Sequence, residues 1–208
     1  MKIDIARQPL VPAFMTLFAL AVAAMCAGIP VSDTSGAVRD ALPLLGGQLA
    51  RFQAAYPVWS KFAAGFMLLF TGMCAGRITI RYNLYTVGTC LPIPLYAIVA
   101  CGIATGGNYL AGFAASMLLA LATKNYCRAF CNGYGFDAIF RASLYLGLMP
   151  LVYAPALPLL LLLPLAVLLF RRTFREVVVA TAGLLLPIFT ACYVSWGSGA
   201  EFTAPLVT

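Results

Sequence analysis

The chain reads LPLLLLLPLAVLLFRRTFRE from Leu157 to Glu176, an apolar run that ends in three closely spaced arginines. Fourteen apolar residues alone fit either a buried core helix or a membrane segment. The same pattern recurs along the whole chain, with apolar runs separated by short basic turns. Such alternation is typical of a polytopic membrane protein.

Composition points the same way. Hydrophobic residues make up 63% of the 208 residues and charged residues only 9%, against roughly 25% charged in a soluble domain. The mean hydropathy is +0.96. We therefore predict an all-α, polytopic transmembrane helical bundle that forms one domain, 1–208. No P-loop, GxSxG, HExxH or Rossmann fingerprint occurs, and the chain has too little polar sequence for a soluble catalytic domain.

The pattern predicts about seven spans (six to seven), at residues 10–29, 58–76, 87–105, 110–123, 142–153, 157–170 and 177–194. The first could also be a signal peptide, but its length favours a retained helix. The fifth and sixth are short and meet at Pro155. A hairpin is the preferred interpretation. The alternative is one kinked span, 142–170, which at 1.5 Å per residue would be about 43 Å long.

The longest polar stretch, 31–56, follows the first span. Its leucines and aromatic residues recur at loosely helical spacing, which predicts a short helix lying on the outer membrane surface. Pro43 and Gly46-Gly47 interrupt that pattern. In the next span, Gly72 and Gly76 have the small-xxx-small spacing that lets helices pack closely.

Basic residues are distributed unequally between the two sides of a seven-span protein. One side receives ten, namely Lys2, Arg7, Arg77, Arg81, Lys124, Arg128, Arg141, Arg171, Arg172 and Arg175. The other receives only Arg39, Arg51 and Lys61. The positive-inside rule then predicts the N-terminus in and the C-terminus out. The Arg77–Asn83 segment is expected to be a short basic loop.

Two kinds of candidate site follow from the charges. Asp33 and Asp40, on the outer side, could be a catalytic acid or metal ligands for a lipid-linked substrate, but loop solvation is the favoured explanation for both. No metal site and no cofactor are predicted, because the chain has no histidine and its cysteines fall mostly in apolar runs.

The second kind is a lipid-phosphate site at the cytoplasmic face. Arg128 and Arg141 are candidates, with Asp137 placed to pair with Arg141 on a helix. Arg171, Arg172 and Arg175 are candidates too, and fixing topology would suffice to explain them. The expected partners are the bilayer, anionic lipid and other membrane subunits. Nucleic acid is not expected, because the net charge of +7 lies in inter-span clusters.

A resemblance covers about half of the chain, residues 81–193. It resembles an uncharacterised family of polytopic inner-membrane proteins from Bacteroidetes, a domain of unknown function. The residues that carry it are Arg81-Tyr82-Asn83-Leu84, Leu91-Pro92, Tyr145-Leu146-Gly147-Leu148, Tyr153-Ala154-Pro155-Ala156-Leu157, Phe170-Arg171-Arg172-Thr173-Phe174-Arg175-Glu176 and Gly183-Leu184-Leu185-Leu186-Pro187. The resemblance implies a multi-pass protein of the bacterial inner membrane and supplies no activity. Members of that family tend to be longer.

The same Tyr153–Leu157 segment also resembles an element of glycosyltransferases that use polyprenyl-phosphate sugars. Those enzymes place acidic residues in their first outer loop, where Asp33 and Asp40 would correspond. No ionisable residue lies near the middle of a span, which argues against an ion-coupled transporter. We therefore expect a non-enzymatic subunit, scaffold or lipid-handling protein of envelope biogenesis. The alternative is an enzyme or transporter for a polyprenyl-linked precursor.

Overall fold

A computed structural model of the chain describes residues 10–26, 44–82, 90–104, 108–131, 135–163, 165, 173–199 and 201–202. All regular structure among these residues is helical, which confirms the all-α part of the predicted fold class. The helices are α1 (Leu10–Cys26), α3 (Leu44–Ala55), α4 (Pro57–Arg81), α5 (Pro92–Ala104), α6 (Tyr109–Cys131), α7 (Phe136–Val152), the 3-10 helix η1 (Ala154–Leu161) and α9 (Phe174–Gly197).

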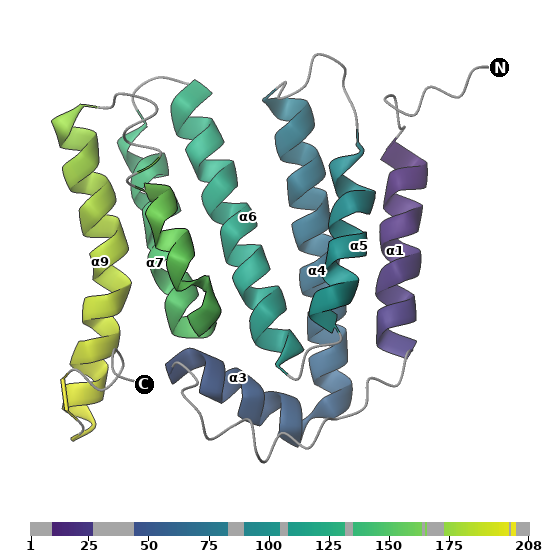
Figure 1. Ribbon diagram of the computed structural model, residues 1–208, viewed down its shortest axis with the longest axis horizontal. Helices are drawn as coiled ribbons and strands as arrows, with labels where there is room; N and C mark the ends of the chain where they lie inside the picture. Colours follow the sequence, from purple (N-terminus) through teal and green to yellow (C-terminus); the bar gives the residue numbers. More distant parts are fainter. Residues whose placement is uncertain are drawn as a thin grey trace.

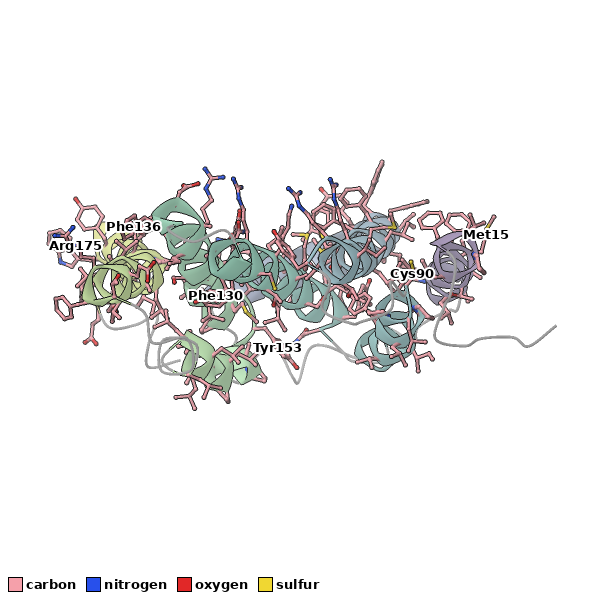
Figure 2. The ribbon with its side chains drawn as sticks, turned by 90° about the horizontal axis from the view of Figure 1, so that it is seen from above. Met15, Cys90, Phe130, Phe136, Tyr153 and Arg175 are labelled. Atoms are coloured by element: carbon pink, nitrogen blue, oxygen red, sulfur yellow. The ribbon has the colours of Figure 1, made fainter. Side chains whose placement is uncertain are left out.

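The long helices stand side by side in a flat row (Figure 1). In that row α7 packs between α6 and α9, while α4 packs between α6 and α1. Seen from above, α5 and η1 lie on one side of the row (Figure 2). Helix α3 lies across one end of the bundle (Figure 1), where it contacts α4, α6 and α7. A helix therefore occupies part of the 31–56 stretch, as predicted, and its place in a membrane interface stays a prediction.

Two helices, α4 with 25 residues and α9 with 24, are long and apolar enough to cross a membrane. Helix α1 contains a shorter apolar segment, Val11–Ala23. Pro57 starts α4 at a position where its missing N–H costs nothing. A capping box starts α9, in which the Thr173 amide donates to the Glu176 carboxylate at 3.3 Å. These findings support membrane association, and the count of seven spans stays a prediction.

The chain reverses direction after α7. Tyr153 is extended, and η1 then runs back beside α7 (Figure 1). Ala156 and Leu163 belong to the same buried cluster as Leu146 and Met149 of α7. Helix α7 ends before Pro155, because proline has no N–H that could continue the helical hydrogen bonds. For the described residues, up to Leu163, this is the geometry of the hairpin and not that of one kinked span.

Helix α4 is longer than predicted. We expected Arg77 and Arg81 in a loop, but α4 continues through Arg81, and the Tyr82 amide donates to the Ile78 carbonyl. The predicted loop was wrong here because arginine is a good helix former, and nothing in 77–81 breaks the helix. Helix α6 also continues, through Arg128 to Cys131. Both extensions carry cations beyond the apolar part of their helices.

Helix α6 connects the bundle through three tyrosine–serine hydrogen bonds. Tyr109 of α6 meets Ser60 of α4 with 2.6 Å between their oxygens. Ser116 of α6 meets Tyr96 of α5 at 3.2 Å, and Tyr126 of α6 meets Ser143 of α7 at 3.3 Å. Such pairs between helices contribute about 0.6 kcal/mol each in a membrane protein. They link α6 to three of its neighbours.

Glycines set the close approach between α7 and α9. A Cβ added at Gly147 would overlap the backbone carbonyl of Leu184. One added at Gly183 would lie 2.8 Å from the Phe140 carbonyl oxygen. Two segments of the proposed family resemblance, one around Gly147 and one around Gly183-Leu184, are thus in contact.

Replacing Gly147 by alanine should destabilise the fold by about 1–3 kcal/mol, because backbone atoms of α9 cannot move away locally. The matched control is Gly102→Ala, on α5, where an added Cβ meets nothing within 4 Å. Unfolding by sodium dodecyl sulfate titration in detergent micelles measures both variants. Equal midpoints for the two would contradict the proposed α7–α9 packing.

Candidate functional site

Several predicted site residues lie outside the described residues. Asp33 and Asp40, the catalytic candidates, are among them, and so are Arg171 and Arg172. The prediction for each of these four residues stays a prediction. In the described part of the chain, no group of three or more His, Cys, Asp or Glu side chains could hold a metal ion.

The other predicted lipid-binding arginines are Arg128, Arg141 and Arg175, and their role in binding lipid phosphate stays a prediction. Arg141 Nε lies 3.0 Å from Asp137 Oδ1, and the two side chains are 58% and 68% exposed. This is the predicted ion pair between residues four apart, and it partly neutralises Arg141. Arg175 lies at one edge of the row of helices (Figure 2). Neither these residues nor Arg128 lines the pocket described next.

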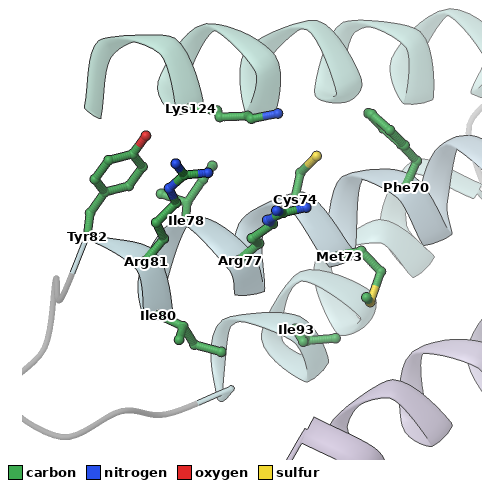
Figure 3. A pocket seen from close by; sticks show the side chains of 10 residues that line it. All are labelled: Phe70, Met73, Cys74, Arg77, Ile78, Ile80, Arg81, Tyr82, Ile93 and Lys124. Atoms are coloured by element: carbon green, nitrogen blue, oxygen red, sulfur yellow. The ribbon is translucent and has the colours of Figure 1, made fainter. Parts of the chain in front are cut away.

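A pocket of about 660 Å³ lies instead between the ends of α4, α5 and α6. Its walls combine three cations with mostly apolar side chains. Figure 3 shows the lining residues, which are Phe70, Met73, Cys74, Arg77, Ile78, Ile80, Arg81, Tyr82, Ile93 and Lys124. Its volume falls within the usual range of small-molecule sites, about 300–1,000 Å³.

The extension of α4 builds one wall of the pocket. Phe70, Cys74, Arg77 and Arg81 are spaced by four, three and four residues, which places them on one face of a helix. Lys124, on the extension of α6, forms the opposite wall and reaches over Cys74 (Figure 3). The two guanidinium groups and the ammonium group therefore converge from two different helices.

Gly76 lets α5 complete the pocket. A Cβ at Gly76 would lie 2.5 Å from Ile93 Cδ1, so the glycine lets the Ile93 side chain pack directly against α4. Gly72 has the same relation to Leu17 of α1, at 2.7 Å. The predicted small-xxx-small pair thus packs against two different helices, and Ile93, on α5, supplies apolar surface to the site.

The pocket is electropositive. The described residues that line it include three cations and no acidic side chain. Arg77 and Lys124 both lie near enough to act electrostatically on the Cys74 thiol. Tyr82 adds a phenol oxygen, which points towards α6 (Figure 3). Such a site can bind an anion that also has an apolar part, because charge-assisted hydrogen bonds and apolar contacts are both available.

Sequence reasoning missed this site. Arg77, Arg81 and Lys124 were interpreted only as residues that fix topology. The spacing of Arg77 and Arg81 could have indicated a shared face if the helix had been predicted to continue. The approach of Lys124 depends on how α4 packs against α6, and no local pattern reports that.

No family model matches the chain, and no curated protein or solved structure is significantly similar to it. The resemblance of residues 81–193 to a membrane-protein family therefore stays a prediction.

The field at Cys74 can be measured with charged thiol reagents on a variant whose only cysteine is Cys74. An anionic thiosulfonate should react at least about tenfold faster than a cationic one of equal size at low ionic strength. The ratio should fall in high salt and in the Arg77→Gln background. Equal rates at low salt would contradict an electropositive pocket.

Proposed function

We propose that the chain is a multi-pass protein of the bacterial inner membrane that handles anionic lipid without transforming it, as a subunit or scaffold of envelope biogenesis. Seven spans with the N-terminus in and the C-terminus out are part of this proposal. The observation that carries it is the cationic, partly apolar pocket at the end of the bundle that the positive-inside rule assigns to the cytoplasm.

The outer surface of the bundle supports the membrane part of the proposal. Large apolar side chains face outwards along α4 and α9, for example Phe66, 68% exposed, and Phe189, 59% exposed. Only 22% of the apolar window of α9 is buried. A soluble core helix would be mostly buried, and monomeric soluble proteins rarely expose apolar patches of this extent. Hydrocarbon is the solvent that suits such a surface.

The two ends of the bundle carry unequal numbers of described cations, which supports the proposed orientation. Alternate helices run in opposite directions (Figure 1), so six described cations share one end, namely Arg77, Arg81, Lys124, Arg128, Arg141 and Arg175. The opposite end has Arg51 and Lys61. It also has both tryptophans, Trp59 and Trp196, which are 69% and 61% exposed. Exposed tryptophans are enriched at membrane–water interfaces.

The pocket supports the lipid part of the proposal. It lies at the cation-rich end of the bundle, which the proposed orientation would bring level with the lipid phosphates of the inner leaflet. Its side chains offer charge and apolar contact, and they suit holding a headgroup more than breaking a bond in it. A free anion would need only the charged half of this lining.

Native mass spectrometry of the full chain, purified in mild detergent, tests the proposal. We expect a retained phospholipid whose mass does not change with time. In an Arg77→Gln/Arg81→Gln variant the lipid-bound fraction should fall by about tenfold or more, since each basic contact near a membrane surface contributes about 1 kcal/mol.

The matched control is Arg51→Gln on α3, an exposed arginine at the other end of the bundle, which should leave the bound fraction unchanged. A protein without bound lipid, or equal retention in all variants, would refute lipid binding at this pocket. A bound lipid that is converted over time would show an enzyme instead.

A further inference from the structure

We infer that the pocket selects a lipid whose phosphate head carries at least two negative charges, a phosphomonoester or a diphosphate, over one with a singly charged phosphodiester. This inference rests on the proposed function. It concerns which anionic lipid is held, and it follows from the charge of the lining, the chemistry of the two arginines and the path open to the tail.

The lining of the pocket carries a high positive charge. Arg77, Arg81 and Lys124 contribute three positive charges, and none of the lining residues that the structure describes is acidic. By contrast, Asp137 pairs with Arg141 on α7. A phosphodiester would compensate one of the three pocket charges. A phosphomonoester carries about −1.5 to −2 near neutral pH, and a diphosphate monoester more.

The hydrogen-bond donors of the pocket favour a headgroup with many free oxygens. Each guanidinium group presents a planar fork that matches two phosphate oxygens, whereas the lysine acts as a point charge. A phosphodiester has two free oxygens, so two forks would compete for them. A phosphomonoester has three and a diphosphate five, which allows Arg77, Arg81 and Lys124 to bind at once. The Tyr82 hydroxyl lies at the same end of the pocket as Arg81 (Figure 3) and can donate a hydrogen bond to a further phosphate oxygen.

The pocket also leaves a path for the hydrocarbon tail of the lipid. Phe70 and Met73 line the end of the pocket away from Tyr82 (Figure 3). Phe70 is 37% exposed and Met73 39%, so both also belong to the outer surface of α4. On the same surface Phe66 is 68% exposed. An acyl or prenyl chain could therefore leave the cations along Phe70 and Met73 and enter the bilayer without crossing a charged residue.

The test uses the full chain with Cys74 as its only cysteine, in nanodiscs of zwitterionic lipid with 10% of one test lipid. The readout is protection of Cys74 from a neutral maleimide. Phosphatidic acid and a polyprenyl diphosphate should each protect Cys74 about fivefold more than phosphatidylglycerol at equal content. The Arg77→Gln variant should lose this preference. Arg77→Lys, which keeps the charge but not the fork, should lose much of it, and Arg51→Gln should keep all of it.

The possible results separate the charge selection from lipid binding itself. Equal protection by phosphatidylglycerol would overturn the charge selection while leaving lipid binding intact. Protection by none of the lipids would overturn both this inference and the proposed function. Protection by inorganic pyrophosphate alone, as strong as by the lipids, would show that the tail contributes nothing and would overturn the lipid assignment. Full retention of the preference in Arg77→Lys, with the monodisperse elution of the parent, would show that charge alone selects the lipid and would overturn the role of the arginine fork.

Discussion

Hydrocarbon offers no hydrogen-bond partner, and in the proposed membrane setting this is the constraint on which the rest of the structure depends. A backbone surrounded by lipid must satisfy its own polar groups, which leaves helices as the available form for a chain of this composition. All regular structure in the described residues is helical. Some polar side chains in the interior pair with one another across helices. Tyr109 with Ser60, Tyr96 with Ser116 and Tyr126 with Ser143 form three such pairs, and each includes a residue of α6.

The same constraint explains how the helices pack. Apolar side chains gain little by leaving lipid for a protein interior, so association depends on close contact and on hydrogen bonds. Gly147 and Gly183 bring α7 and α9 together, while Gly72 and Gly76 admit side chains of α1 and α5. The larger apolar side chains are left to face outwards. Charges collect at the helix ends, and at one end the extensions of α4 and α6 hold three of them around a pocket.

The sequence predicted that the fold is all-α, because its composition and its long apolar runs indicate helices in an apolar environment. It also predicted the reversal at Pro155 and the pairing of Asp137 with Arg141, since a proline and a four-residue spacing are local signals. It placed the end of α4 wrongly, because hydropathy falls at Arg77 while helical structure continues to Arg81. The pocket could not be predicted, since it joins Lys124 to Arg77 across about fifty residues of sequence through tertiary packing. Asp33 and Asp40 lie outside the described residues, so their roles stay predictions.

The most direct test of contact with hydrocarbon is the depth of tryptophan in a bilayer. Trp59 and Trp196 are the chain's two tryptophans and both are exposed. Phe66 lies about 10 Å further along α4 than Trp59 at 1.5 Å per residue. Lipids brominated near the headgroup should quench the two native tryptophans most strongly. In a variant with both tryptophans replaced by phenylalanine, a tryptophan introduced by Phe66→Trp should be quenched most by bromine deep in the acyl chain. Quenching of all three by aqueous acrylamide, with none by brominated lipid, would contradict the account.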